Sequence, residues 1–530
     1  MLILSLYKKL PMILQGSTNR SSIFCAKTLL TGIALLGLGV VGWTINPVEP
    51  ASAAGIVGDG TPGSCTEAAL DTALAGGGNV YFNCGSSPVT ITLTREKIIS
   101  ANTIINGSTN WQTLITLSGG GTTRIFKTTD NNIQFTVKNL TIANGSTTDS
   151  GGGIYSGYRG KLTVYNCKFI NNISTNVGKF DGGGAIFSKS ESRVIISKST
   201  FIGNTAANGG AINSLLSNLM VTNSSFTGNK SVVSISGGGG GAIYYDGANG
   251  DKGGIILRGN TFTNNTAVFQ GGAIFSQLYN REISTIDSNT FSGNSVTGTG
   301  NQGFGGAIFN VGGTLSGLNG FTGGANQTIL TVRNSSFFAN TASNQGGGLW
   351  NGNDATVNIV NSTFFGNQAV SANGADGLGG GIMRTSGKIN ITNSTITGNY
   401  AGFQGGGIVG GVETTIANTI IANNVANNGG KNWNIKNNCF DQMTNGGNNL
   451  QFPARNTNDP SDRDCTAGIL IANPQLFPLG NNGGSTQTLA LLPGSPAMNA
   501  GNNATCPTTD QRGVARPQGG VCDIGAFEAQ

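Results

Sequence analysis

Side chains capable of acid–base chemistry are scarce and scattered in this sequence. There is no histidine, and no Asp-Asp pair occurs among the 23 acidic residues. A glycoside hydrolase usually needs two facing carboxylates, and a calcium-dependent lyase needs a positioned base together with oxygen ligands for its metal. The carboxylates of Asp181, Asp246, Asp287 and Asp354 instead lie far apart along the chain. We therefore expect no catalytic residue, no metal site and no cofactor, in a protein that is not an enzyme.

The stretch Asp246-Gly247-Ala248-Asn249-Gly250-Asp251 is the best local candidate for a metal site, because two acids flank a glycine-rich turn. Its spacing is not that of a calcium-binding loop. We interpret this stretch as an insertion in an external loop.

Charged residues are also concentrated near the end of the chain, at Asp510, Arg512, Arg516 and Asp523. These four side chains could form a catalytic cluster. Polar residues in turns rich in glycine and proline, however, mostly satisfy backbone groups. We therefore interpret them as a structural network that closes the last coil of a repetitive fold.

The composition indicates regular β structure rather than disorder. Glycine accounts for 87 of 530 residues and charged residues for only 10%, but Val, Ile, Thr and Phe occur throughout. Disordered chains are poor in β-branched and aromatic residues, so we interpret the glycines as turns between strands. The net charge of +6 is not concentrated in a basic cluster, and we expect no nucleic-acid partner.

The first 53 residues resemble an export signal. An apolar run from Leu29 to Trp43 follows Lys27, and the small-x-small pattern Ala51-Ser52-Ala53 comes after it. The alternative is an uncleaved membrane anchor, but the run is shorter than the ~20 residues that a membrane span usually takes. We expect export to the extracellular space or the outer surface of a bacterial cell, with the periplasm as the alternative, and membrane contact only through this segment.

Removal of this segment would leave seven of the eight cysteines, and export permits disulfides. Cys167 has no near neighbour. The candidate disulfides are the neighbouring pairs Cys65 and Cys84, Cys439 and Cys465, and Cys506 and Cys522. Sequence does not fix the connectivity, so free buried thiols remain the alternative.

One unit recurs along the middle of the chain: a short apolar segment, Phe-x-x-Asn, a variable stretch, and Gly-Gly-Ala-Ile or a close variant. The Phe and Asn positions are Phe169 and Asn172, Phe201 and Asn204, Phe226 and Asn229, Phe262 and Asn265, Phe291 and Asn294, Phe337 and Asn340, and Phe364 and Asn367, followed by Ile396 and Asn399. The order is constant although the spacing varies, which a low-complexity linker would not show.

Such a unit cannot bury its apolar side alone. Stacking one coil on the next pairs every strand at about 4.8 Å and creates a continuous core. We expect the Phe and Ile side chains to point inward and stack. Each Asn is expected at a turn, where its amide bonds its own backbone or the amide of the next coil. The sequence therefore predicts an all-β parallel solenoid.

The open ends of a solenoid need caps. The stretch Ser64-Cys65-Thr66-Glu67 has the pattern of a capping box before a helix with apolar residues on one face. We expect a short N-terminal capping helix and an irregular C-terminal cap. The predicted divisions are a signal peptide at 1–53, the N-terminal cap and first coils at 54–115, β-helix repeats at 116–430, and a C-terminal cap at 431–530.

Two parts of the chain resemble known families. The repeats over about residues 139–425 resemble those of the chlamydial polymorphic outer membrane proteins and related bacterial β-helix proteins. This resemblance implies a right-handed parallel β-helix of the pectin-lyase-like type, a surface location and adhesion. Residues 470–528 resemble the C-terminal module of bacterial choice-of-anchor Q proteins in their Leu492-Pro493-Gly494-Ser495-Pro496 and Cys522-Asp523-Ile524-Gly525 stretches, which implies proximity to a surface-attachment signal.

We therefore expect an exported cell-surface or secreted protein that binds or displays in an adhesin-like manner, with a polysaccharide or another cell-surface component as its partner. One alternative is a polysaccharide lyase or hydrolase on the same fold, since fold alone does not decide function. A long groove lined by acids and basic residues would support it. The other alternative is a structural component of the cell envelope without a ligand, which self-association would support.

Overall fold

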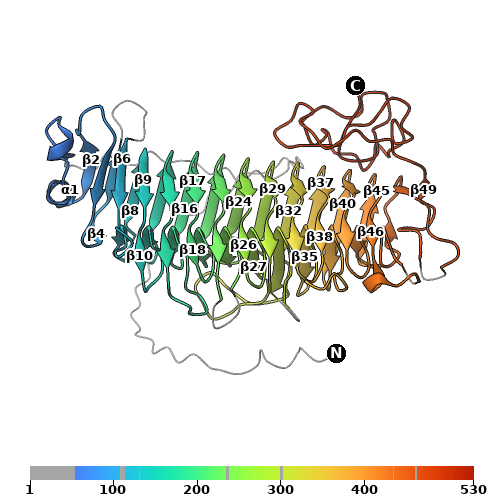
Figure 1. Cartoon of the computed structure of the whole chain (residues 1–530), viewed down its shortest axis with the longest axis horizontal. Helices are drawn as coiled ribbons and strands as arrows, with labels where there is room; N and C mark the ends of the chain where they lie inside the picture. The colour runs from blue at the N-terminus through green and yellow to red at the C-terminus, as the bar shows by residue number, and fades with distance from the viewer. Residues whose placement is uncertain are drawn as a thin grey trace, which may run out of the picture. The chain divides into compact units, whose positions relative to one another are not determined.

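Short parallel strands dominate this computed structural model, which describes residues 54–107, 114–130, 132–233, 238–298, 302–433, 435–459 and 462–530 (Figure 1). The predicted signal peptide lies outside the described residues. Each strand pairs in parallel with the strand at the same position of the next coil, so that the described strands form four parallel sheets. The fold is a right-handed parallel β-helix, as predicted.

Sheet A has 14 described strands and forms one side of every coil. Its strands are β1 (Ala54–Val57), β2 (Gly78–Phe82), β5 (Thr103–Asn106), β8 (Gln134–Lys138), β12 (Lys161–Tyr165), β16 (Arg193–Ser197), β20 (Asn218–Thr222), β24 (Gly254–Arg258), β28 (Ile283–Asp287), β32 (Ile329–Arg333), β36 (Thr356–Val360), β40 (Lys388–Thr392), β44 (Thr414–Ala417) and β47 (Thr444–Asn445).

Sheet B also has 14 described strands and follows sheet A along the chain. Its strands are β3 (Val89–Thr92), β6 (Ile115–Ser118), β9 (Leu140–Ala143), β13 (Lys168–Ile170), β17 (Thr200–Ile202), β21 (Ser225–Thr227), β25 (Thr261–Thr263), β29 (Thr290–Ser292), β33 (Ser336–Phe338), β37 (Thr363–Phe365), β41 (Thr395–Thr397), β45 (Ile420–Ala422), β48 (Leu450–Phe452) and β49 (Leu470–Ile471).

Sheets C and D have 11 and 10 described strands and complete the coil. Sheet D consists of β10 (Ser146–Thr147), β14 (Ile173–Ser174), β18 (Thr205–Ala206), β22 (Lys230–Ser231), β26 (Thr266–Ala267), β30 (Ser295–Val296), β34 (Thr341–Ala342), β38 (Gln368–Ala369), β42 (Tyr400–Ala401) and β46 (Val425–Ala426). Sheet C consists of β4 (Lys97–Ile99), β7 (Phe126–Thr128), β11 (Ile154–Ser156), β15 (Ile186–Ser188), β19 (Ile212–Leu215), β23 (Ile243–Asp246), β27 (Ile274–Tyr279), β31 (Ile308–Gly313), β35 (Leu349–Gly352), β39 (Ile382–Arg384) and β43 (Ile408–Val409). A complete coil runs through sheets A, B, D and C in that order.

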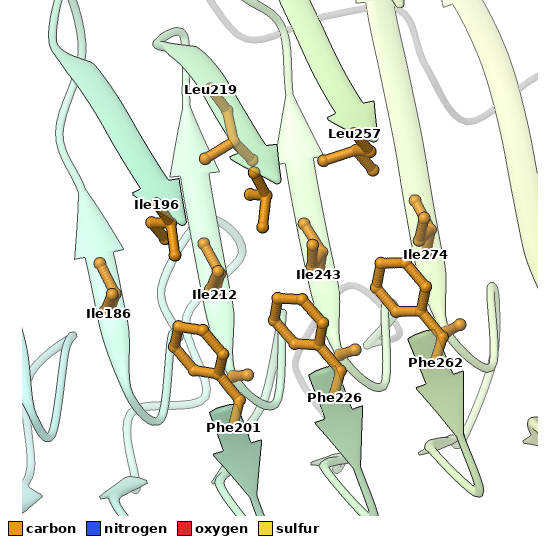
Figure 2. Packing of buried hydrophobic residues seen from close by; sticks show 14 of the residues in the cluster. Ile186, Ile196, Phe201, Ile212, Leu219, Phe226, Ile243, Leu257, Phe262 and Ile274 are labelled. Carbon is orange, nitrogen blue, oxygen red and sulfur yellow. The ribbon is translucent and has the colours of Figure 1, made fainter. Parts of the chain in front are cut away.

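The period-2 alternation of each strand sends one set of side chains into the coil. In β24, Ile255 and Leu257 are buried, while Arg258 is exposed. The repeat Phe of β25 and the repeat Ile of β27 also point inward (Figure 2). Stacked rings of the Phe column, from Phe169 to Phe364, have centroids 4.4–4.9 Å apart. The predicted core therefore forms, with each Phe in contact with its counterparts.

The repeat Asn side chains form a buried ladder at the turn between sheets B and D. The Asn265 Nδ2 donates to Asn294 Oδ1 at 2.9 Å and to the Phe226 carbonyl oxygen at 3.0 Å. In return, the Asn265 Oδ1 accepts from the backbone N–H and the Nδ2 of Asn229. The same arrangement extends from Asn172 to Asn424 and Asn438. Each side chain thus satisfies polar groups of two neighbouring coils.

The two glycines of each motif have different roles. Gly271 has φ +64°, in the left-handed region, and a Cβ there would collide with the carbonyl oxygen of Ile274. Gly272 lies against the next coil, where a Cβ would collide with the Gly306 carbonyl oxygen. The first glycine is therefore required for the bend and the second for close packing of coils.

The N-terminal helix α1 (Glu67–Leu74) packs its Leu70 and Ala73 against the first coil. A 3₁₀ turn, η1 (Pro62–Ser64), precedes it. The predicted capping box is wrong: Thr66, not Ser64, is the N-cap, and its side chain accepts from the Ala69 N–H. Glu67 is unavailable for a capping box because its carboxylate bonds Lys97 and Thr94.

We expect Thr66→Ala to destabilise helix α1 by about 1 kcal/mol, because it removes the acceptor for an otherwise unpaired N–H group. The matched control is Thr72→Ala in the same helix, where the Thr72 hydroxyl bonds only the Ala68 carbonyl oxygen. Amide hydrogen exchange across residues 67–74 measures both effects. Equal protection in the two variants would contradict the assignment of Thr66 as the cap.

Coil pairing continues past residue 430 into the stretch that was expected to be irregular. Strand β47 pairs with β44, while β48 and β49 extend sheet B. A second 3₁₀ turn, η2 (Asn428–Gly430), leads into this stretch. Cys439 and Cys465 form a disulfide buried against the end of the core. The strands of residues 431–471 thus extend the solenoid, and the described residues 473–530, which contain no strand of the four sheets, are called the C-terminal module below.

Candidate functional site

The repeat residues named from the sequence belong to the scaffold. The repeat Phe and Asn side chains from Phe169 to Asn399 are all fully buried. They contact one another across coils and leave no polar atom directed at a ligand. Any binding or catalytic site must therefore lie on the outer faces of the sheets or in the loops.

A second polar ladder, which the sequence analysis missed, lies at the turn between sheets A and B. The Ser199 Oγ accepts from the Cys167 N–H at 3.1 Å, and the Ser224 Oγ accepts from the Ser199 N–H at 3.0 Å. Asn260 and Asn289 continue the ladder. The recurring Ser or Asn two residues before each Phe was the available signal. Cys167 occupies the same position, two residues before Phe169, and forms no disulfide. Its thiol is buried, and burial raises its pKa to about 12.

The six other described cysteines form disulfides in the pairs suggested by their proximity. Cys65 bonds Cys84, Cys439 bonds Cys465, and Cys506 bonds Cys522. The first joins the segment before helix α1 to the end of β2, and the last lies within the C-terminal module. All three are structural cross-links outside the repeats.

The candidate metal-binding stretch 246–251 was interpreted as an external loop, but its first residue belongs to a strand. Asp246 is the last residue of β23 and is buried, and it accepts a hydrogen bond from the Tyr279 hydroxyl at 2.6 Å. Burial raises the pKa of Asp246 and, together with Asp246, that of Tyr279. Asp251 accepts from Asn280 Nδ2 at 2.6 Å and from Thr322. Both acids are therefore engaged in holding neighbouring loops.

Glu282 is a third acid in this region and is fully buried. Its two carboxylate oxygens accept from the Ala248 N–H at 2.7 Å and the Tyr279 N–H at 2.9 Å. Burial raises its pKa from 4.5 to about 8, an effect that these two hydrogen bonds oppose. These hydrogen bonds connect the loop after β23 to the turn after β27.

The raised pKa predicts a pH dependence of stability. Between pH 4.5 and about 8 the folded protein retains a proton on Glu282 that the unfolded chain has released. The free energy of unfolding should therefore fall as pH rises through this window and level off above it. Glu282→Gln should remove this part of the slope, while the exposed control Glu413→Gln should keep it. Urea unfolding at pH values below, within and above the window is the measurement, and equal slopes for all three proteins would contradict the prediction.

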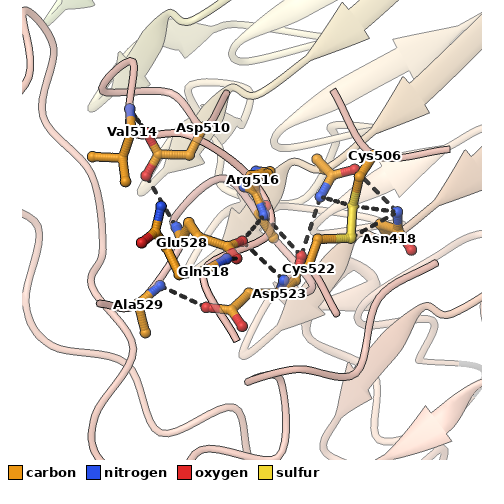
Figure 3. Close-up of polar contacts among 12 residues, drawn as sticks. Asn418, Cys506, Asp510, Val514, Arg516, Gln518, Cys522, Asp523, Glu528 and Ala529 are labelled. Carbon is orange, nitrogen blue, oxygen red and sulfur yellow. Dashed lines mark hydrogen bonds and ion pairs between the residues drawn. A yellow bond between two sulfur atoms is a disulfide. The ribbon is translucent and has the colours of Figure 1, made fainter. Parts of the chain in front are cut away.

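The charged residues near the end of the chain form a buried network within the C-terminal module (Figure 3). The Arg516 guanidinium pairs with Glu528 at 2.8 Å and donates to the Asp523 and Gly525 carbonyl oxygens. Asp510 pairs with Arg512 at 2.7 Å and accepts from the Glu528 N–H. Burial raises the pKa of Asp523 and Glu528 and lowers that of Arg516. The carboxylates of Asp510, Asp523 and Glu528 are thus buried and accept hydrogen bonds from within the module.

This network does not close the last coil, which corrects the expectation. The C-terminal module packs along the outer face of sheet B, against β33, β37, β41 and β45 (Figure 1). The Thr363 hydroxyl donates to Gln511 Oε1 at 2.7 Å, and the Thr395 Oγ1 accepts from the Ala526 N–H at 3.1 Å. An apolar seam completes the contact and contains Ile420, Leu450, Leu491, Ala497 and Ile524. The module thus covers a side of the solenoid rather than its end.

A cleft opens where the C-terminal module meets sheet B, and we call it the flank cleft. Its volume is about 470 Å³, within the range of small-molecule sites. Its floor is the outer face of β37 and β41 with the turns that follow β41 and β45. Its wall is the segment 473–478 together with Leu489 and Leu492. The lining residues are Phe365, Thr397, Gly398, Asn423, Asn473, Pro474, Gln475, Leu476, Phe477, Pro478, Leu489 and Leu492.

The wall of the flank cleft is held in place by a short antiparallel ribbon. The Phe477 N–H donates to the Ala490 carbonyl oxygen, and the Leu492 N–H to that of Gln475, both at 2.8 Å. The Asn473 Oδ1 accepts from the Gln475 N–H. Below it, Gly398 has φ +65°, and a Cβ there would press on the Phe365 ring. The cleft is therefore formed by constrained backbone on both sides.

Other features offer less to a ligand. A polar pocket of about 190 Å³ beside Arg455 and Asp462 is smaller than typical ligand sites. Trp350 is buried in a stack on Phe309, and Trp111 lies outside the described residues. In the described part of the chain, acidic, cysteine and histidine side chains do not gather in threes around a potential metal. Within the same residues, the helices are too short to cross a membrane.

Comparison with known proteins agrees with the repeat pattern. Residues 223–246 and 261–277 match the Chlamydia polymorphic membrane protein repeat. Each matched stretch contains a Phe-x-x-Asn and a Gly-Gly-Ala-Ile motif, so the match falls on the Phe column, the Asn ladder and the glycine bends. No match to the chain was found among the curated proteins.

Fold and repeat together define the class. This is a right-handed parallel β-helix that carries repeats of the Chlamydia polymorphic membrane protein type. Such repeats indicate a β-helix protein associated with the outer surface or the outer membrane.

Proposed function

We propose that this protein is an exported β-helix that binds a component of a cell or matrix surface, in an adhesin-like manner and without cleaving it. The repeat match supports the outer-surface location. The likeness of residues 470–528 to a choice-of-anchor Q module supports a site close to surface attachment. The scaffold supplies a rigid support, because its core and ladder residues are buried and mutually satisfied.

The flank cleft is open to a ligand, whereas several carboxylates that could support catalysis are buried. The flank cleft presents aromatic rings and amide groups on constrained backbone. The buried carboxylates of Asp510, Asp246 and Glu282 are instead held by an arginine, by Tyr279 and by backbone N–H groups, respectively. A pair of free facing carboxylates is what hydrolysis would require.

Two measurements test this function. Antibody labelling of intact cells should detect the protein without lysis, and the purified protein should bind an immobilised glycan or matrix array. Labelling only after lysis would contradict the surface location. Self-association without binding to any array component would favour a structural role in the envelope instead.

A further inference from the structure

We propose that the flank cleft is a binding site for a neutral saccharide, an assignment that rests on the proposed surface-binding function. The residues that line the cleft include no Asp, Glu, Lys or Arg within the described part of the chain. An anionic ligand would leave its charge unpaired there, and leaving a charge or polar group without a partner in a cleft is costly. The lining therefore favours an uncharged ligand over a uronic acid or a phosphorylated group.

The floor also favours a polar ligand, because it contains a hydroxyl that pairs with no described residue. Thr397 is 3% exposed, and its hydroxyl makes no hydrogen bond to any described residue. Its neighbours in the same column of sheet B are Phe365 and Ala422, which cannot pair with it. A ligand hydroxyl at this position would gain a hydrogen bond that no described residue supplies.

Amide groups at the rim add donors and acceptors. Asn423 and Gln475 are exposed, line the cleft and make no side-chain hydrogen bond to a described residue. Both residues have left-handed backbone, at φ 53° and 49°, which fixes where their side chains begin. Amides pair with hydroxyl groups in either direction, which suits the vicinal hydroxyls of a sugar.

Aromatic and apolar residues of the flank cleft also suit a sugar ring. Phe365 lies on the floor, and Phe477, whose side chain is 47% exposed, lies in the wall. Aromatic faces bury apolar C–H surface at little conformational cost. A sugar ring has both an apolar C–H face and a hydroxyl edge, whereas an apolar peptide would leave the Thr397 hydroxyl and the rim amides unpaired. A volume of about 470 Å³ has room for a short oligosaccharide segment.

Titration calorimetry with the purified protein tests this assignment. The probes are cellohexaose, maltohexaose, mannohexaose and galactohexaose, with hexagalacturonate as the charged comparison. We expect at least one neutral hexasaccharide to bind and hexagalacturonate to bind at least 10-fold more weakly. Phe477→Ala and Thr397→Val should each weaken that binding by about 10-fold or more, equivalent to about 1.4 kcal/mol.

Matched control variants distinguish a loss of contacts in the flank cleft from a general effect on the fold. Phe403→Ala removes another exposed ring, and Thr227→Val changes an exposed threonine in the same column of sheet B. Both controls should bind as the wild type does. Wild-type affinity in the two cleft variants, or a preference for hexagalacturonate, would overturn the cleft assignment while array binding still upheld the proposed function. Binding of no array component and no hexasaccharide by the wild type would overturn both.

Discussion

Asn265→Ala should lower the free energy of unfolding by about 4 kcal/mol, although it removes one small polar side chain. Asn265 is fully buried and makes hydrogen bonds with both neighbouring coils. Its loss leaves the Asn229 N–H without an acceptor and the Phe226 carbonyl oxygen without the Asn265 donor. Each unsatisfied buried group costs about 1–3 kcal/mol, and members of a ladder are coupled.

The chain contains a matched control for this substitution. Asn390 Nδ2 donates to Asn358 Oδ1 at 2.9 Å on the exposed face of sheet A, so that these residues also form an amide pair between adjacent coils. Because water can replace this bond, Asn390→Ala should cost less than about 0.5 kcal/mol. Urea unfolding of the two variants gives the comparison. Similar losses would mean that amide pairing as such, and not burial, determines the effect.

Phe262→Ala should also be strongly destabilising, by about 3–5 kcal/mol. Its ring lies 4.9 Å from that of Phe226 and 4.8 Å from that of Phe291, so truncation opens a cavity between two coils. Solenoid stability is a sum of coil terms and interfaces between neighbours, and both interfaces of this coil are weakened.

Two further variants make the Phe262 prediction specific. Phe262→Leu retains most of the buried volume and should cost less than Phe262→Ala. Phe403→Ala removes a partly exposed ring and should change stability by no more than about 0.5 kcal/mol. Urea unfolding, with hydrogen exchange to locate the opening, measures all three. A small effect of Phe262→Ala would show that the Phe column is not the continuous core.

Most of the fold could be predicted from the residue types of the recurring motif. Phe262, Asn265 and the glycines at 271 and 272 each occupy a position that only a few residue types can fill, so the pattern is visible in one sequence. The motif also made clear that coils stack. It did not reveal sheet D, because strands of two residues such as Thr266–Ala267 have no periodicity to read.

The flank cleft could not be predicted from the sequence, because it depends on contacts between segments far apart in the chain. Thr363 meets Gln511, and Thr395 meets Ala526, across more than a hundred residues. The charged residues at 510–523 indicated a structural network but gave no sign of the surface against which it packs. The predicted cap of helix α1 was wrong for a similar reason: Glu67 pairs with Lys97, a residue distant in sequence.

We propose that this β-helix binds a surface saccharide and leaves it intact. Native mass spectrometry of the purified protein, incubated with the neutral hexasaccharides and with hexagalacturonate, tests it directly. We expect a protein–hexasaccharide complex at the summed mass and hexasaccharides of unchanged mass after long incubation. Shortened oligosaccharides, or products that carry a new double bond, would contradict it.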